Sequence, residues 1–97
     1  MFVSVVIPTY NRLPILQKCL DALEGQFLIK EITDFEIVVV DDGSTDGTTE
    51  WIKSNSFHYP HVCLYEQTHG GPALGRNLGV EKSRGEVIVF IDSDLVV

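Results

Sequence analysis

Two aspartates one residue apart stand at the end of an apolar run, where residues 87–91 lead directly into Asp92, Ser93 and Asp94. In extended backbone, residues i and i+2 point to the same side, so both carboxylates can reach one small volume. Two unpaired acids would repel each other there, and a hard divalent cation, which prefers oxygen ligands, relieves that repulsion. The pattern therefore predicts a metal site with positions open for phosphate oxygens and water. The alternative is a turn in which the acids cap backbone N–H groups.

A second pair of acids, Asp41 and Asp42, follows the largely apolar residues 35–40. A carboxylate at the end of a strand could accept hydrogen bonds from a nucleobase or a ribose. The same residues could also form a strand-to-helix turn, in which Gly43 adopts a positive φ and Asp46 caps the next helix. Both interpretations can hold together if different acids take the two roles.

Small residues cluster in residues 70–77, which begin with Gly70 and Gly71. Glycine lets the backbone approach a ligand closely, and the first N–H groups of a helix have no partner within the helix. Arg76 lies one turn after Pro72, so it could reach a ligand near that end of the helix. The segment thus predicts a phosphate-binding loop. The alternative is that the small residues permit close packing of a helix on a sheet.

A polar turn also follows the first apolar run, with Thr9, Tyr10 and Asn11 directly after Pro8. The Tyr10 ring could stack on a nucleobase, or it could simply cover the end of the sheet. The turn has no glycine-rich stretch, so it does not fit a dinucleotide-binding fingerprint.

These polar clusters alternate with apolar segments in a regular order. The sequence predicts strands over residues 2–7, 35–40, 61–65 and 87–91, and helices over residues 14–24, 46–54 and 72–83. Pro8 is expected to stop the first strand and Gly25 the first helix, whereas Pro72 begins the third helix. Strands that are apolar on both faces and joined by helices indicate an α/β fold with a parallel sheet covered on each side. Ligands bind at the carboxyl ends of the strands in such sheets, where the polar clusters fall.

Composition sets the class of protein and argues against some partners. The chain has 97 residues, of which 44% are apolar, enough for the core of one small domain. Its 14 acidic and 7 basic residues give a formal net charge of -7, which argues against nucleic acid and anionic membranes as partners. Cys19 and Cys63 lie in apolar surroundings and are expected to be reduced, buried thiols. No leader peptide or membrane-spanning run is recognisable, so a cytoplasmic location without an integral membrane segment is expected.

Four ordered segments together resemble the donor half of family 2 glycosyltransferases. They are residues 3–12, 37–48, 70–79 and 85–94. The match spans essentially the whole chain, although Gly75 stands where alanine is common and His69 where asparagine is common. The resemblance implies the parallel-sheet, nucleotide-binding half of a GT-A fold, alternating β-α-β-α-β-α-β. It also implies that residues 1–97 are an N-terminal donor-binding portion from which the acceptor portion is absent.

The resemblance implies a nucleotide diphosphate sugar as the donor, often a uridine one. Thr9 and Tyr10 would border the base, and Asp41 would hydrogen-bond it. Arg76 would help to hold the nucleotide. The predicted nucleotide-sugar-binding residues are Pro8, Thr9, Tyr10, Asn11, Asp41, Asp42, Gly70, Gly71, Arg76, Asp92 and Ser93.

The same resemblance implies which ion the chain binds and which residues are its ligands. Asp92 would meet the ribose or the metal, and Asp94 would ligate Mg²⁺ or Mn²⁺ bridging the diphosphate.

The catalytic base is expected outside this sequence. The family places the acceptor pocket and the base beyond the Asp-Ser-Asp segment, which here means beyond Val97, so no residue of the chain is predicted to be catalytic. We therefore expect the isolated chain to bind nucleotide and metal without turnover, and to expose apolar surface that favours a homodimer or strand exchange. The alternatives are a sugar nucleotidyltransferase and a non-catalytic nucleotide-binding or interaction fragment.

Overall fold

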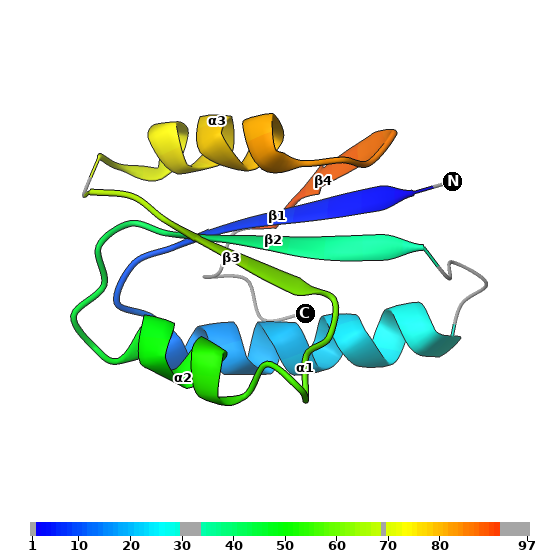
Figure 1. Ribbon diagram of the computed structural model, residues 1–97, viewed down its shortest axis with the longest axis horizontal. Coiled ribbons are helices and arrows are strands. Elements are labelled where there is room, and N and C mark those ends of the chain that lie inside the picture. The colour runs from blue at the N-terminus through cyan, green and yellow to red at the C-terminus, as the bar shows by residue number, and fades with distance from the viewer. Residues whose placement is uncertain (1, 30–33, 69, 92–97) are drawn as a thin grey trace.

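Four strands and three helices alternate along the residues that the computed structural model describes, which are 2–29, 34–68 and 70–91 (Figure 1). They are, in chain order, β1 (Val3–Thr9), α1 (Leu13–Ile29), β2 (Phe35–Asp41), α2 (Thr48–Ser54), β3 (Val62–Glu66), α3 (Pro72–Lys82) and β4 (Val87–Phe90). This order confirms the predicted α/β alternation. Pro72 begins α3, since its missing N–H costs nothing in the first turn of a helix.

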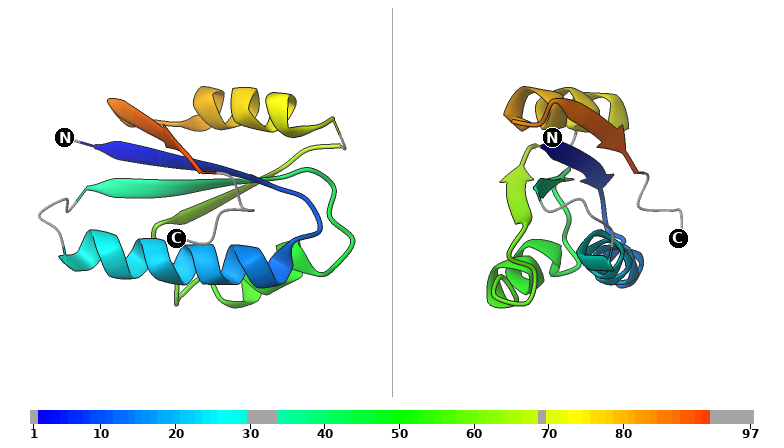
Figure 2. Two further views of the ribbon diagram at one scale, coloured as in Figure 1. Left: turned by 180° about the vertical axis from the view of Figure 1, so that it is seen from behind. Right: turned by 90° about the vertical axis from the view of Figure 1, so that its right-hand side faces the viewer.

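The strands of the described sheet are all parallel, in the order β3-β2-β1-β4. α1 and α2 cover one face and α3 covers the other (Figures 1 and 2). The chain adds β2 and β3 on one side of β1 and then crosses to the other side of β1 to form β4. The strand order therefore reverses between β1 and β4. Open α/β sheets bind ligands at such a point, outside the carboxyl ends of the strands.

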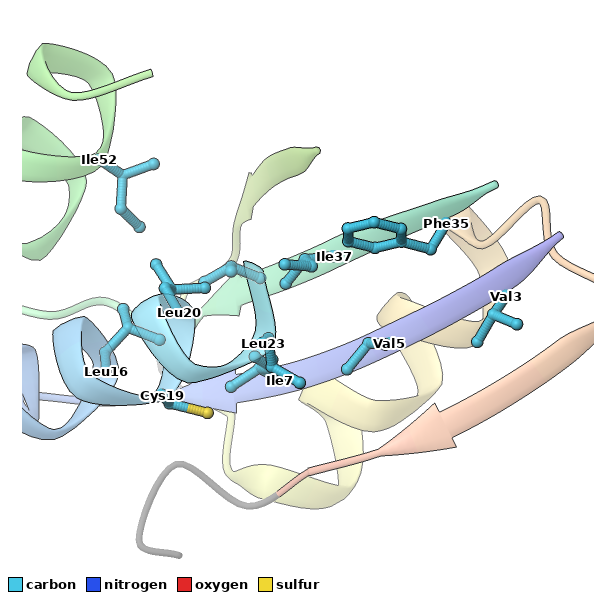
Figure 3. Packing of buried hydrophobic residues seen from close by; sticks show 11 residues of the cluster. Val3, Val5, Ile7, Leu16, Cys19, Leu20, Leu23, Phe35, Ile37 and Ile52 are labelled. Carbon is cyan, nitrogen blue, oxygen red and sulfur yellow. The ribbon is translucent and has the colours of Figure 1, made fainter. Parts of the chain in front are cut away.

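Apolar side chains pack on both faces of the sheet. The larger cluster includes Leu16 and Leu20 of α1, which lie against alternate residues of β1 and β2 (Figure 3). The smaller cluster, under α3, contains Val6, Val38 and Val40. Because both faces are covered, β1 and β2 are buried along most of their length. This explains why their sequences are nearly continuous apolar runs instead of alternating ones.

Glycines let α3 approach the sheet closely. A Cβ atom added to Gly79 would lie 2.2 Å from Cγ1 of Val6, and one added to Gly75 would lie 3.2 Å from Cβ of Pro8. The first distance is far shorter than the roughly 3.5–4.0 Å at which carbon atoms pack best. The alternative interpretation of residues 70–77, that small residues permit close helix–sheet packing, is therefore confirmed at Gly75, and Gly79, which lies beyond that segment, packs still more closely.

We predict that Gly79→Ala lowers the free energy of unfolding by about 1–3 kcal/mol, because the side chain of Val6 is fully buried and cannot move aside. Gly75→Ala is a matched control on the same helix. Its neighbour Pro8 need shift by only a few tenths of an ångström, and alanine favours helix, so the expected change is within about 1 kcal/mol. Urea denaturation measures both values. Equal stability of Gly79→Ala and the wild type would contradict this account of the packing.

The expectation that Pro8 stops the first strand is wrong, because β1 continues to Thr9. Alternate residues of β1 direct their main-chain groups to opposite neighbours. The carbonyl of Val6 accepts from the N–H of Ile91 at 3.0 Å, whereas that of Thr9 accepts from the N–H of Asp42 at 2.9 Å. The nitrogen of Pro8 therefore faces the β4 side, beyond the paired part of β4. Its missing N–H therefore removes no hydrogen bond from the described strand pairs.

The expectation that Gly25 ends the first helix is also wrong, because α1 continues to Ile29. A glycine inside a helix costs only about 1 kcal/mol relative to alanine. Packing of the apolar face of α1 on the sheet, through Leu16, Leu20 and Leu23, outweighs that cost. No helix in the described ranges, α1 included, is long and apolar enough to cross a membrane.

The two cysteines are free thiols in different surroundings. Cys19 is buried in the core between α1 and the sheet, as predicted, whereas Cys63 in β3 is only half-buried. The difference arises because β3 is an edge strand of the described sheet. Burial raises the pKa of both thiols above the ordinary value of 9.0.

β4 forms the other edge of the described sheet and carries exposed apolar side chains, namely those of Val87, Val89 and Phe90. An edge strand of this kind offers unpaired main-chain groups as well as apolar surface. The homodimer or strand exchange expected from the sequence stays a prediction.

Candidate functional site

The loops that follow β1, β2 and β3 meet at the carboxyl edge of the sheet, on the left in Figure 1. β4 runs toward the same edge, and the N–H of Ile91 still pairs with the carbonyl of Val6. Asp92, Ser93 and Asp94 follow in the chain and lie outside the described residues. The predicted gathering of polar clusters at one edge is confirmed for the first three loops.

A buried polar pair lies at the ends of β1 and β2. Thr9 and Asp41 are partners in the parallel register, so their side chains point to the same face. They are 3% and 1% exposed. Oδ2 of Asp41 accepts from the N–H of Ser44 at 3.1 Å, but Oδ1 of Asp41 and Oγ1 of Thr9 have no hydrogen-bond partner among the described residues. An unsatisfied buried polar atom costs about 1–3 kcal/mol, so both atoms are suited to a ligand.

Tyr10 follows Thr9 directly, and its side chain is 41% exposed. A ring exposed at this edge of the sheet can stack on a planar ligand bound there. Pro8 lies on the other face of the sheet, where it is next to Gly75 of α3. Pro8 is thus a packing residue for α3, and its predicted contact with a nucleotide stays a prediction.

Asn11 connects the loop after β1 to the loop after β2. Its Oδ1 accepts from the N–H of Thr45 at 2.8 Å, and its own N–H donates to Oγ of Ser44 at 2.8 Å. Its φ of 50° is in the left-handed region, which asparagine tolerates better than most residues. The structure therefore shows Asn11 bound to protein groups, and its predicted contact with the nucleotide is not tested.

The expectation that Asp46 caps the second helix is wrong, because the N-cap residue of α2 is Gly47. Asp46 stands one residue earlier, where its carboxylate accepts from the N–H of Thr48 at 3.2 Å and from that of Leu13 at 3.0 Å. Burial alone would raise the pKa of Asp46, but the hydrogen bonds from Thr48 and Leu13 outweigh burial and lower it below the ordinary 3.8. One carboxylate thus joins the beginnings of α1 and α2.

Asp42 is buried and holds the loop between β3 and α3. Its Oδ1 accepts from Nε2 of Gln67 at 2.8 Å and from the N–H of Gly70 at 2.7 Å, and its Oδ2 accepts from the N–H of Gly71 at 3.0 Å. The carboxylate of Asp42 thus binds the N–H groups of both glycines. The predicted contacts of Asp42, Gly70 and Gly71 with a nucleotide stay a prediction. Gly71 is needed for the turn itself, since its φ is 90°.

Arg76 lies in the second turn of α3 and is exposed. α3 begins at the carboxyl edge of the sheet (Figure 1). The neighbouring Gly75 packs on Pro8 near the end of β1. A guanidinium group at this edge suits an anionic ligand, because it presents fixed N–H donors to phosphate oxygens. The contact of Arg76 with a nucleotide stays a prediction.

Sequence reasoning missed three side chains that shape this edge, those of Ser44, Thr45 and Gln67. Residues 43–47 are rich in glycine, serine, threonine and aspartate, which is typical of hydrogen-bonded turns. That composition could have indicated bonds from this loop to its neighbour. Nothing in the sequence marks Gln67 in the same way.

Within residues 2–29, 34–68 and 70–91, no group of three or more His, Cys, Asp and Glu side chains is placed to hold a metal ion. The predicted ligands Asp92 and Asp94 lie outside these ranges. The predicted metal site therefore stays a prediction.

The expectation of a catalytic base beyond Val97 is not tested either. Val97 itself lies outside the described residues, as do the predicted site residues Asp92, Ser93 and Asp94. The placement of the base and of the acceptor pocket after Val97 therefore stays a prediction.

A parallel sheet covered on both faces, with a reversal of strand order and a polar site at its carboxyl edge, is typical of open α/β domains, a class that includes many nucleotide-binding proteins. The sequence model of the family described as "Glycosyl transferase family 2" matches residues 4–97, and the chain belongs to this family. The family and the GT-A fold inferred from the sequence are thus confirmed.

Several known proteins are similar to this chain. It is 41% identical over 96 residues to a poly(ribitol-phosphate) beta-glucosyltransferase of Bacillus spizizenii, covering 97% of this chain and 15% of that protein. The structure of Staphylococcus aureus TarS 1–349 in complex with UDP-GlcNAc matches with a TM-score of 0.83 and 35% identity, covering 97% of this chain and 27% of the other.

The mannosyltransferase PcManGT from Pyrobaculum calidifontis, in complex with GDP-Man and Mn²⁺, matches with a TM-score of 0.82 and 32% identity. The match covers 95% of this chain and 27% of that one. The chain therefore spans less than a third of the length of each of these three proteins.

Proposed function

We propose that this chain is the donor-binding portion of a glycosyltransferase that uses a uridine diphosphate sugar. The buried pair of Thr9 and Asp41 carries the proposal, together with the exposed Tyr10 that follows Thr9 in the chain. Uracil presents one N–H donor flanked by two carbonyl acceptors along its edge. A carboxylate oxygen complements the donor and a hydroxyl group complements a carbonyl.

In this proposal Asp41 accepts from the imide N–H of uracil, Thr9 donates to a neighbouring carbonyl, and Tyr10 stacks on the ring. Arg76, exposed on α3, offsets the charge of the diphosphate. The similar TarS structure contains UDP-GlcNAc, which supports uracil as the base. Guanine, named in the GDP-Man complex of PcManGT, is the second candidate because it also presents an N–H donor along its edge.

Asp92 and Asp94 would hold Mg²⁺ or Mn²⁺. Two carboxylates one residue apart are hard oxygen donors and fit either ion. When bound, such an ion neutralises charge that develops on the leaving diphosphate. The Mn²⁺ in the PcManGT complex supports this part of the proposal.

We further propose that the isolated chain binds nucleotide and metal without turnover, with the catalytic base supplied by residues beyond Val97. The chain spans less than a third of the length of the three proteins described above, which supports this part of the proposal.

The proposal is tested by titrating the chain with UDP in a calorimeter, with and without Mn²⁺. CDP is the matched control, because cytosine has an acceptor where uracil has the imide N–H. We expect UDP to bind at least about tenfold more tightly than CDP, a difference of about 1.4 kcal/mol, and to bind more tightly with Mn²⁺ present. Equal affinities for UDP and CDP would contradict the assigned base contacts, and affinity unaffected by Mn²⁺ would contradict the metal site.

A further inference from the structure

A chain of hydrogen bonds runs from Asn11 to the buried carboxylate of Asp41. The N–H of Asn11 donates to Oγ of Ser44 at 2.8 Å, and the N–H of Ser44 donates to Oδ2 of Asp41 at 3.1 Å. The other oxygen of Asp41 is the one without a partner among the described residues. The position of Ser44 therefore decides how Asp41 presents that second oxygen.

The side chain of Asn11 holds the same loop at the next residue. Its Oδ1 accepts from the N–H of Thr45 at 2.8 Å, and 3.5 Å separates it from Oγ1 of Thr45. Asp46 adds a further link between the two loops by accepting from the N–H of Leu13. These bonds join residues that are 33 or 34 positions apart in the chain. They restrict the loop after β2 relative to the loop that carries Tyr10.

The geometry points to Asn11 as a positioning residue. We infer that it acts as a hydrogen-bond acceptor toward Thr45, and through Ser44 orients Asp41 for the base, without touching the nucleotide itself. This inference rests on the proposed function, and it assigns Asn11 a different role from the direct contact predicted from the sequence. A group held within hydrogen-bond reach of its ligand loses affinity steeply when its orientation is relaxed.

The positioning role and a direct contact with the nucleotide require different groups on the side chain of Asn11. A direct contact through the amide NH₂ group of Asn11 would need a donor, whereas the bond to Thr45 needs only an acceptor. Aspartate retains the acceptor and tolerates the left-handed φ of 50°, but it has no NH₂ group. Glycine also tolerates that φ and has neither group. Asn11→Asp and Asn11→Gly therefore separate the two roles without adding backbone strain.

The experiment titrates uridine into the wild type and both variants by NMR. Uridine is uncharged, so the added charge of Asn11→Asp does not repel it. We expect Asn11→Gly to weaken uridine binding by about tenfold and Asn11→Asp by less than about threefold. Ser4→Ala, at the opposite end of β1, is the control for general loss of stability and is expected to leave the affinity unchanged. Binding by Asn11→Asp that is as weak as binding by Asn11→Gly, or wild-type affinity in Asn11→Gly, would overturn the inference.

A second readout needs no ligand. In the wild type the N–H groups of Ser44 and Thr45 both donate to side chains. Their amide signals should move in Asn11→Gly and return toward wild-type positions in Asn11→Asp. Failure of the wild type to bind uridine or UDP refutes the proposed function, whereas unmoved amide signals in Asn11→Gly refute the positioning role.

Discussion

Replacing Asp41 by asparagine is expected to weaken UDP binding by about 10- to 100-fold, the equivalent of about 1.4–2.7 kcal/mol. Oδ2 of Asp41 is engaged by the N–H of Ser44, so the asparagine keeps its carbonyl oxygen there and turns its NH₂ group toward the base. Two donors then face each other, because the imide of uracil also presents an N–H group. Titration calorimetry of the variant with UDP measures the loss.

The stability of Asp41→Asn should not fall with its affinity. The carboxylate is 1% exposed, and one of its oxygens has no partner among the described residues, so neutralising it removes a desolvation cost. We expect a melting temperature equal to or above that of the wild type. Asp34→Asn, the same substitution on an exposed side chain just before β2, is the control and should change neither property. Wild-type affinity for UDP in Asp41→Asn would refute the assigned base contact.

The fold could be predicted from the sequence because its central strands, β1 and β2, are nearly continuous apolar runs separated by a helical pattern. Buried apolar runs bounded by polar turns indicate parallel strands whatever their exact partners. The errors at Pro8 and Gly25 have one cause. Both residues break regular structure locally, but tertiary contacts outweigh this tendency. The nitrogen of Pro8 faces the β4 side beyond the described pairing of β1 with β4, and Gly25 lies in a helix that packs on the sheet.

The location of the site could be predicted from the sequence. Which of the two neighbouring acids binds the protein and which is left for a ligand could not. Asp41 and Asp42 are adjacent and chemically identical. Yet one oxygen of Asp41 has no partner in the part of the chain that the structure describes, whereas Asp42 binds the loop before α3. Neighbouring residues at the end of a strand point to opposite faces. Because β2 is apolar on both faces, its sequence contains no alternation that would reveal which acid faces which side. Long-range bonds such as that from Asn11 to Thr45 leave no periodic pattern either.

The largest effect on stability is expected far from the site, at Glu36. This acid is 3% exposed on its side chain, and its Oε2 accepts from Oγ of Ser4 and from the N–H of Arg84, both at 2.7 Å. Ser4 in turn accepts from the N–H of Gly85 at 2.8 Å. Glu36→Leu keeps most of the volume but leaves these donors without their acceptor. We predict a loss of about 2–5 kcal/mol in the free energy of unfolding, measured in urea.

Two further variants separate the parts of this network. Arg84→Ala removes the guanidinium group, whose bond to Oε1 spans 3.2 Å, but keeps the main-chain N–H. The side chain of Arg84 is 70% exposed, so its ion pair is screened by water and the expected loss is below about 1 kcal/mol. Glu36→Gln keeps one carbonyl oxygen for Ser4 and the main chain, so its loss should be intermediate. A loss in Arg84→Ala as large as that in Glu36→Leu would place the stabilisation in the surface ion pair instead.

The difference in stability between the wild type and Glu36→Leu should depend on pH, because the contacts of Glu36 change the pKa of its carboxyl group. Burial alone would raise the pKa of Glu36, but the hydrogen bonds from Arg84 and Ser4 outweigh burial and lower it below the ordinary 4.5. The unfolded chain therefore takes up the proton at a higher pH than the folded chain does. The stability that wild type holds over Glu36→Leu should be fully present above pH 4.5 and should shrink as the pH falls through the lower pKa of the folded state. A difference that stays constant in urea titrations down to about pH 3 would show that the shape of the side chain, and not its charge, stabilises this end of the sheet.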